Sequence, residues 1–166
     1  MAHMRYLIYA EIAERERYKN IARLFRAIAY AEYVHARNHS RRLSGLDADF
    51  KVVAGSAFGP GDTRKNLGQA IRGENFEVEE MYPAYIKIAE LQGDRQALQS
   101  FKWALEAEKI HGELYKKALE YLEKGQDMPI DGYIWVCPVC GHTYIGSEPP
   151  EKCPICGSPG EKYVKF

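Results

Sequence analysis

Acidic and imidazole side chains interrupt the apolar stripes of this sequence in three places. Each stripe begins and ends with apolar residues, and spacings of three or four residues put its members on one face of a helix. The polar members are Glu32, His35 and His39, then Glu74 and Glu77, and then Glu108 and His111. The third-helix stripe continues through Tyr85, Ile88 and Leu91. The pattern predicts a polar layer inside a helical bundle.

Burying unpaired carboxylates costs several kcal/mol each, so this layer needs compensation. No Lys or Arg occupies the central stripe positions. Two divalent cations would balance the four glutamates, with two neutral imidazoles completing the coordination, as in di-metal carboxylate bundles. A donor set rich in carboxylate and free of thiolate favours iron or manganese over copper or zinc. The alternative is a solvated acidic face with two surface histidines.

Apolar spacing and capping residues predict four helices. Their expected ranges are residues 2–16, 18–44, 62–91 and 94–124. Asp62 or Thr63 can cap the third helix, Gly93 ends it, and Asp94 caps the fourth. Residues 45–62 interrupt the helical pattern, and we expect a loop there with some extended structure around Val52-Val53.

An internal repeat supports the pairing of these helices. At an offset of 76 residues the motif F-x5-A-E-x-x-H occurs twice, along with a pair of tyrosines. The matched pairs are Tyr6 and Tyr82, Phe25 and Phe101, Glu32 and Glu108, and His35 and His111. A two-helix unit used twice predicts a mainly α fold, a four-helix bundle.

The four cysteines are all confined to one short C-terminal segment. They are Cys137, Cys140, Cys153 and Cys156. Two C-P-x-C-G motifs are typical of knuckles that present four thiolates to iron or zinc. A disulfide framework would instead spread cysteines through the chain, so the pattern indicates a reducing compartment. A structural zinc ribbon remains the alternative for this segment.

Composition divides the chain and excludes several functions. We expect a helical domain over residues 1–124, a Gly- and Pro-containing linker over 125–132, and a cysteine module over 133–166. Lys+Arg and Asp+Glu total 23 each, which excludes the basic footprint of a nucleic-acid binder. No apolar run reaches the roughly 18 residues of a membrane span, and the first residues lack signal-peptide organisation. We therefore expect a cytoplasmic protein.

Two tyrosines stand close to the predicted site in sequence. Tyr82 lies five residues after Glu77, and Tyr6 is its repeat partner. Either hydroxyl could reach and orient a ligand carboxylate. Ordinary aromatic packing in the core explains both residues equally well.

Taken together, these motifs resemble the rubrerythrin family. The resemblance rests on E32-x-x-H35, on G73-E74-x-x-E77 followed by M81-Y82-P83, on E108-x-x-H111, and on the two C-P-x-C-G pairs. It implies a ferritin-like four-helix bundle with a di-iron centre, followed by a small rubredoxin-like β module that binds iron through four cysteines. The implied activity is reduction of hydrogen peroxide to water in oxidative-stress defence, with electrons relayed through the rubredoxin-like iron.

The resemblance also implies a role for each site residue. Glu32 and Glu108 would bridge the two irons, Glu74 and Glu77 would be terminal ligands, and His111 would be the histidine ligand. Glu77 would exchange with His35 as the oxidation state changes. The implied catalytic residues are Glu77, His35, Tyr82 and Tyr6, and the implied ligands of the third iron are Cys137, Cys140, Cys153 and Cys156.

The resemblance further implies cofactors and partners. The cofactors would be two non-haem irons in the bundle and one iron, or zinc after recombinant expression, at the cysteines. Electrons would come from rubredoxin or an NAD(P)H-dependent reductase. The expected assembly is a homodimer in which the rubredoxin-like iron of one subunit faces the di-iron site of another. No nucleic acid or membrane partner is expected.

Two positions depart from the family pattern. The family carries a further glutamate seven residues before the tyrosine that matches Tyr6, a position that falls before Met1. We expect the native protein to carry this carboxylate upstream of the present sequence. The alternative is a variant with five or six ligands and one exposed iron. Arg17 occupies a position between the first two helices where relatives have glycine. Two other functions remain open: a ferroxidase or iron-handling ferritin-like protein, and a zinc-ribbon helical scaffold for protein binding.

Overall fold

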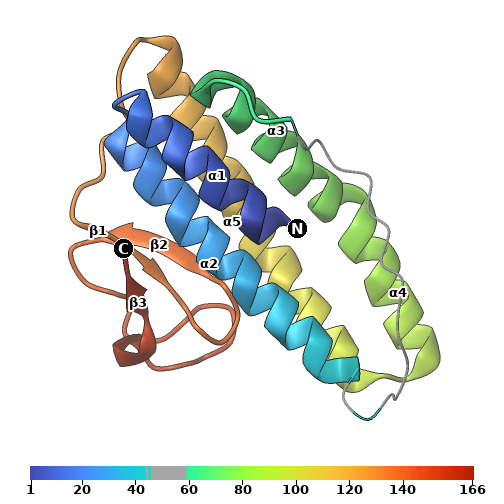
Figure 1. The fold of residues 1–166 in the computed structure, drawn as a ribbon. Helices are drawn as coiled ribbons and strands as arrows, with labels where there is room; N and C mark the ends of the chain where they lie inside the picture. The colour runs from blue at the N-terminus through green and yellow to red at the C-terminus, as the bar shows by residue number, and fades with distance from the viewer. Residues whose placement is uncertain (44, 46–58) are drawn as a thin grey trace.

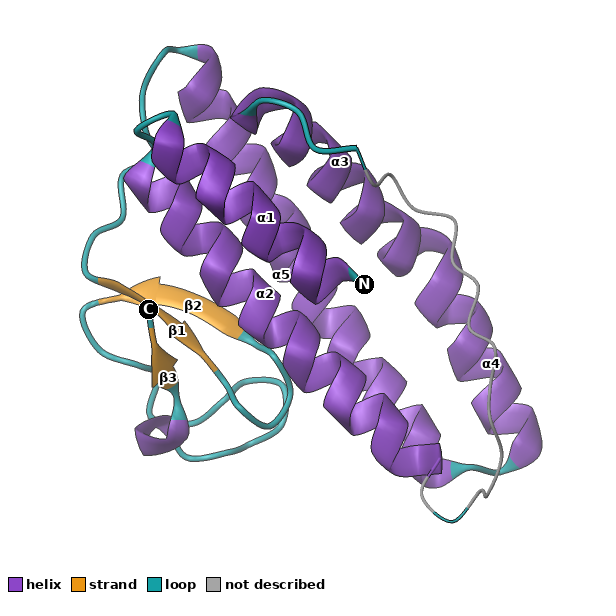
Figure 2. Ribbon diagram, in the orientation of Figure 1, coloured by secondary structure: helices purple, strands orange, loops and turns teal. Residues whose placement is uncertain are grey.

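Four helical rods pack lengthwise into an elongated bundle, with a small β module beside it (Figures 1 and 2). This computed structural model describes residues 1–43, 45 and 59–166, so the predicted extended run at Val52-Val53 lies outside the described residues. The helices are α1 (Ala2–Arg15), α2 (Lys19–Ser40), α3 (Thr63–Phe76), α4 (Tyr82–Gln92) and α5 (Arg95–Glu123). A 3-10 turn, η1 (Arg41–Leu43), follows α2. The predicted four-helix architecture is confirmed.

The third predicted helix is one rod built from three segments. Between α3 and α4 lies a π-helical segment, η2 (Glu77–Met81). A π segment widens one turn of the helix, and such segments occur frequently at functional sites. It contains Glu77, so the helix is irregular at one of the predicted ligands.

The predicted capping residues are present at the start of α3, at the end of α4 and at the start of α5. The Asp62 side chain accepts a hydrogen bond from the Lys65 backbone amide at 2.7 Å. The Asp94 carboxylate accepts from the amides of Gln96 and Ala97. Gly93 has a φ of 69°, in the left-handed region where glycine carries no steric penalty. These caps set the boundaries of α3 and α5.

The turn between α1 and α2 contains a strained residue. Arg17 has a φ of 70° and is the single non-glycine residue with positive φ in the described part of the chain. Its exposed side chain gains no burial from this position. The glycine expected from the family pattern would adopt this conformation more easily.

Aromatic rings from three helices fill the core next to the predicted polar layer. Tyr6 and Tyr9 of α1, Phe25 of α2 and Tyr115 of α5 are each no more than 1% exposed. The ring centroids of Tyr6 and Tyr115 lie 5.4 Å apart, and those of Phe25 and Tyr115 lie 5.1 Å apart. Such packing is worth about 0.5–1.5 kcal/mol per pair beyond burial and fixes how the three helices meet.

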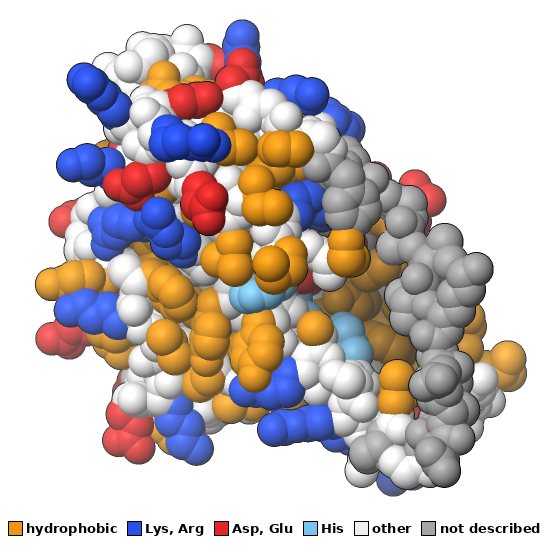
Figure 3. Space-filling view, in the orientation of Figure 1, with side chains coloured by type: hydrophobic (Ala, Val, Ile, Leu, Met, Phe, Trp, Pro, Cys, Tyr) orange, Lys and Arg blue, Asp and Glu red, His pale blue; other side chains and the backbone are white. Residues whose placement is uncertain are grey.

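The apolar stripe of the third rod is exposed beyond the π segment, contrary to the sequence expectation. Tyr85, Ile88 and Leu91 are 43%, 51% and 88% exposed. The reason is that α4 packs against α5, whereas α1 packs against α2 and α3. Figure 3 shows hydrophobic side chains gathered across the middle of one face of the molecule. Even so, none of the described helices has the length and apolar character needed to cross a bilayer.

The C-terminal module is a three-stranded antiparallel sheet, as expected. Its strands are β1 (Tyr133–Val136), β2 (Thr143–Gly146) and β3 (Val164–Lys165), in the order β2-β1-β3, and a 3-10 turn, η3 (Gly160–Lys162), precedes β3. Trp135 of β1 pairs with Tyr144 of β2 and with Lys165 of β3. The cysteines lie outside the strands, in the loops at one end of this sheet.

The segment between α5 and β1 is fastened to the start of α2. Asp127 accepts hydrogen bonds from the backbone amides of Asn20 and Ile21, at 2.7 and 3.1 Å. The Asn20 side chain donates to the Met128 carbonyl, and the Met128 side chain is fully buried. The module consequently packs on α2 and α5 of its own chain.

Candidate metal centres

The predicted carboxylate layer lies in the middle of the bundle. Glu32 of α2, Glu74 of α3, and Glu108 and His111 of α5 offer ligand atoms that all lie within 4.8 Å of one another. All four side chains are at most 8% exposed. Three helices therefore direct acidic and imidazole groups to one buried point, as their spacing predicted.

Glu108 lies between two imidazoles. Its two oxygens are each 2.7 Å from a histidine nitrogen, Nδ1 of His35 and Nδ1 of His111. Burial raises the pKa of Glu108, but the charge of His35 and the hydrogen bond with His111 outweigh it and hold the pKa well below its usual range. Burial likewise acts against the His35 imidazolium, while Glu108 raises the pKa of His35 overall. Glu108 is therefore ionised.

Glu74 and Glu77 of the third rod differ from Glu108, because their pKa values are raised. Burial, together with the charges of Glu108 and Glu32, raises the pKa of Glu74 well above its usual range. Burial and the same two carboxylates also raise the pKa of Glu77, which lies on the π segment. Tyr6 donates a 2.5 Å hydrogen bond to one oxygen of Glu74 and so orients it. Without a bound cation, Glu74 and Glu77 are therefore protonated more readily than ordinary glutamates.

Unsatisfied polar atoms show that the layer fits bound metal. Within this layer, Glu32 Oε1 and Glu74 Oε2 have no hydrogen-bond partner among the described residues, and His35 Nδ1 and Glu108 Oε1 face each other at 2.7 Å without good alignment. Such atoms are rare in folded proteins, and each costs about 1–3 kcal/mol. Here they converge on one point, and their oxygen and nitrogen chemistry suits iron. This is the candidate di-iron site. His35 and Glu77 lie beside its tightest cluster.

Tyr82 makes a different contact from its repeat partner. Its hydroxyl lies 3.2 Å from Nε2 of His39, and its side chain is 3% exposed. Burial and the charges of Glu108 and Glu77 raise the pKa of Tyr82 well above its usual range, and Tyr82 directly follows the π segment that carries Glu77. Its implied hydrogen bond to a ligand carboxylate stays a prediction.

Arg5 is a neighbour of the site that the apolar stripes did not indicate. Its guanidinium lies 5.4 Å from the centre of the Tyr6 ring. Burial opposes its charge, but Tyr6 and Glu32 raise the pKa of Arg5 overall. Arg5 lies on α1, and the apolar stripes that indicated the site belong to the other three predicted helices. Helical periodicity therefore did not identify Arg5.

The four cysteines form the second centre. Their sulfurs all lie within 4.8 Å of one another. Cys137 Sγ is 3.7 Å from Cys156 Sγ, and Cys140 Sγ is 3.4 Å from Cys153 Sγ. Four thiolates placed tetrahedrally at about 2.3 Å from a metal ion would be about 3.8 Å apart. The donor set therefore fits one tetrahedral ion, as in a rubredoxin-like site.

Two glycines shape the cysteine loops. Gly141 and Gly157 follow the second cysteine of each motif and have φ values of 85° and 73°. Their amides donate to the carbonyls of Cys137 and Cys153 and close the two knuckles. A Cβ at Gly141 would also lie 2.2 Å from Nε2 of His35. Gly141 therefore permits both the turn and the approach of the bundle.

The two centres meet through these loops. Nε2 of His35 lies 3.1 Å from the Cys140 carbonyl oxygen. Nε2 of His111 lies 2.9 Å from the Thr143 hydroxyl and 3.3 Å from the Gly141 carbonyl. Sequence reasoning missed these partners because nothing in the spacing relates the module to the bundle. The family resemblance placed the facing centres on different subunits, whereas here they face each other within one chain.

Comparison with known proteins gives a consistent result over the whole chain. The sequence model described as Rubrerythrin matches residues 1–119, and that described as Rubrerythrin, rubredoxin-like domain matches residues 135–164. Rubrerythrin-2 of Clostridium acetobutylicum is 46% identical over 166 residues, covering 100% of this chain and 89% of that protein. Nigerythrin of Nitratidesulfovibrio vulgaris is 34% identical over 99% of this chain and 79% of its own length.

The fold has a close counterpart among solved structures. The fully reduced, all-ferrous state of nigerythrin superposes with a TM-score of 0.86 at 32% identity, covering 99% of this chain and 79% of that one. The similarity spans both the bundle and the cysteine module.

Proposed function

The chain belongs to the rubrerythrin family, and from this premise we propose that it is a peroxidase that reduces hydrogen peroxide to water. One observation carries the proposal. The imidazole of His35 lies 2.7 Å from Glu108 on one side and 3.1 Å from the Cys140 carbonyl on the other. A single side chain thus joins a site suited to two irons with a site suited to one redox-active iron.

The residues that would hold the metals follow from the two clusters. The bundle ligands would be Glu32, His35, Glu74, Glu77, Glu108 and His111, and the module ligands Cys137, Cys140, Cys153 and Cys156. When bound, an iron pair would supply Lewis acidity and two electrons for peroxide, and an iron at the cysteines would supply single electrons.

The protein's own groups hold and orient this centre. Glu108, ionised between two imidazoles, keeps a negative charge at the middle of the layer. Tyr6 fixes the orientation of Glu74 through its short hydrogen bond. We assign to Glu77 and His35 the exchange that accompanies a change of oxidation state, because both lie beside the tight cluster and Glu77 stands on an irregular helical segment.

Partners and setting are part of the same proposal. Electrons would come from rubredoxin or an NAD(P)H-dependent reductase and enter at the cysteine module. The domains would divide at residues 125–132, and the protein would act as a cytoplasmic homodimer. The approach of the two centres within one chain supports a relay inside each subunit.

The first prediction separates electron relay from peroxide chemistry. Cys137→Ser removes one thiolate from the module and leaves the bundle ligands in place. The chemically reduced variant should still complete one turnover with peroxide in a stopped-flow experiment. Steady-state turnover with an external reductase should be lost. Glu148→Gln, an exposed change in the same module, is the matched control and should behave as wild type.

The same measurements distinguish the alternatives. Undiminished steady-state turnover in Cys137→Ser would contradict the relay. Oxidation of added Fe(II) by oxygen, with no reaction with peroxide, would favour an iron-handling protein. Retention of zinc at every site after anaerobic reconstitution with iron would leave the protein colourless and favour a binding scaffold.

A further inference from the structure

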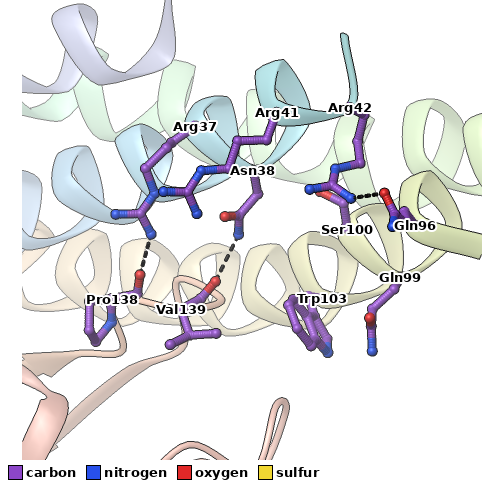
Figure 4. A pocket seen from close by; sticks show the side chains of 10 residues that line it. All are labelled: Arg37, Asn38, Arg41, Arg42, Gln96, Gln99, Ser100, Trp103, Pro138 and Val139. Carbon is purple, nitrogen blue, oxygen red and sulfur yellow. Dashed lines mark hydrogen bonds between the residues drawn. The ribbon is translucent and has the colours of Figure 1, made fainter. Parts of the chain in front are cut away.

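A polar cavity opens where the bundle meets the cysteine module. It has a volume of about 360 Å³ and lies between the C-terminal part of α2, the N-terminal half of α5 and the first cysteine loop. Figure 4 shows arginine, glutamine and serine side chains around it, with Trp103 and Val139 on the module side. A lining so rich in hydrogen-bonding groups suits water that exchanges with solvent.

A hydrogen-bonded chain leads inward from this cavity. Ser100 lines the cavity and is 7% exposed, and its hydroxyl lies 2.8 Å from Nδ1 of His39. Nε2 of His39 lies 3.2 Å from the hydroxyl of Tyr82. Tyr82 is buried at the start of α4, directly after the π segment that carries Glu77. Three side chains from α2, α4 and α5 therefore connect solvent with the carboxylate layer.

We propose that Ser100, His39 and Tyr82 form a proton path from the arginine-lined cavity to the carboxylate site. The inference rests on the proposed peroxidase function for its purpose, because peroxide reduction consumes protons at a buried site. It adds two residues, Ser100 and His39, that are not metal ligands.

The chemistry of the path balances. Reducing one hydrogen peroxide to two waters breaks the O–O bond and takes up two electrons, supplied by the reduced metal centre, and two protons. Water gives a proton to Ser100 as the Ser100 proton moves to Nδ1 of His39. The Nε2 proton moves to Tyr82 as the Tyr82 hydroxyl proton leaves toward the carboxylates. The ring then carries its proton on Nδ1. Before the second transfer it releases this proton to water in the cavity and takes one from that water at Nε2, so the proton count of the ring does not change.

The surroundings of His39 suit a relay. Burial and the neighbouring His35 lower the pKa of His39 to about 4, so the ring is neutral at physiological pH. A neutral imidazole accepts at one nitrogen and donates at the other, as the two contacts require. The ring centroids of Phe101 and His39 lie 5.2 Å apart, so an aromatic ring packs beside the imidazole.

The test replaces the His39 imidazole with an apolar ring, which removes the proton-carrying nitrogens and keeps the site filled. In His39→Phe, single-turnover oxidation of the reduced protein by peroxide should slow by about 100-fold, the usual range for loss of general acid–base catalysis. His39→Ala should be slowed equally, and added imidazole, entering from the cavity, should restore it. Imidazole should not restore His39→Phe. Phe101→Leu changes the packing on His39 without touching its hydrogen bonds and is the matched control.

A second measurement does not depend on turnover. In zinc-loaded protein, which lacks redox chemistry, exchange of the Tyr82 hydroxyl proton with solvent is followed by NMR. His39→Phe and Ser100→Ala should each slow this exchange by about tenfold, and Ser100→Ala serves where His39→Phe does not fold. If these variants slow the exchange but the iron-loaded protein does not react with peroxide, the result would support the proton path and contradict the proposed peroxidase function. Unchanged exchange, or loss of metal in His39→Phe, would overturn the path.

Discussion

Glu108 shows what single residues contribute to this site. It is ionised because two histidines contact it at 2.7 Å, and its charge in turn raises the pKa values of Glu74 and Glu77. The metal-free layer therefore takes up protons to lower its charge, whereas metal ions would displace those protons. Protonation and metal binding compete for the same atoms.

The pH dependence of metal-free protein follows from these shifts. A carboxyl whose folded pKa is raised binds more protons when folded than when unfolded, so its contribution to stability falls as pH rises above its unfolded value. Glu74 and Glu77 act in this sense above pH 4.5, and His35 does so above pH 6.5. His39, whose folded pKa is lowered to about 4, acts in the opposite sense below pH 6.5. Urea unfolding of metal-free protein should therefore show stability falling from pH 6.5 to 9. For each proton that is bound in the folded but not in the unfolded protein, the free energy of unfolding should fall by about 1.4 kcal/mol per pH unit.

The iron-loaded protein is the control for this experiment. Its carboxylates are held ionised by the metal, so the fall should be much smaller or absent. Glu74→Gln, which removes one of the raised groups, should flatten the profile of the metal-free protein. A metal-free protein that becomes more stable as pH rises over this range would contradict the assignment.

How far the sequence predicts this site depends on the type of contact. Glu32, Glu74, Glu108 and His111 converge because helical periodicity fixes their faces, and the pairing of helices follows from the repeat. Periodicity has no information on contacts between elements far apart in sequence. The pairing of Tyr82 with His39 was therefore not predicted, nor was that of His35 with Cys140.

At the scale of elements, capping chemistry predicts boundaries better than periodicity does. Asp62, Gly93 and Asp94 are placed as expected, because each satisfies or ends a helix locally. The π segment was not predicted, since its extra residue is absorbed within an unbroken rod. Beyond it the apolar stripe turns away from the core, which leaves Ile88 and Leu91 exposed.

The turn between α1 and α2 offers a stability prediction. Arg17→Gly should raise the free energy of unfolding by about 1 kcal/mol, because a left-handed conformation costs a residue with a Cβ about 1–2 kcal/mol and glycine recovers most of it. Arg17 is exposed with a φ of 70°, so no packing is lost. Urea unfolding of the metal-loaded protein measures the change.

The control for this substitution lies in the neighbouring helix. Glu11 is also exposed but has a helical backbone within α1, so Glu11→Gly should lower stability by about 0.5–1 kcal/mol. Opposite signs for the two glycine substitutions would assign the gain to the backbone of Arg17. A loss of stability in Arg17→Gly would show that this turn is not strained.

At the scale of the whole molecule, docking of the module brings the two centres together. Asp127 and Met128 fasten the connecting segment to the start of α2. Arg37 and Asn38 of α2 donate to the carbonyls of Pro138 and Val139 in the first cysteine loop (Figure 4). These contacts hold backbone atoms of the module against the histidines of the bundle, so the proposed electron relay would depend on docking as well as on metal content.

Gly141 allows docking to be tested apart from folding of the module. In Gly141→Ala the added methyl group would lie 2.2 Å from His35, and the φ of 85° would also be strained. Gly157→Ala carries the same type of backbone strain, with a φ of 73°, but its Cβ meets nothing within 4 Å. The two variants therefore differ mainly in whether the module can approach the bundle.

Both variants should bind metal at the cysteines, because all four thiolates are retained. Only Gly141→Ala should release the module, seen as faster proteolysis within residues 125–132, and it should lose at least tenfold in steady-state electron transfer to the bundle. Gly157→Ala should keep both properties near wild type. Equal losses in the two variants would assign the effect to the cysteine knuckle, whereas wild-type electron transfer in Gly141→Ala would show that contact between His35 and this loop is not required for the relay.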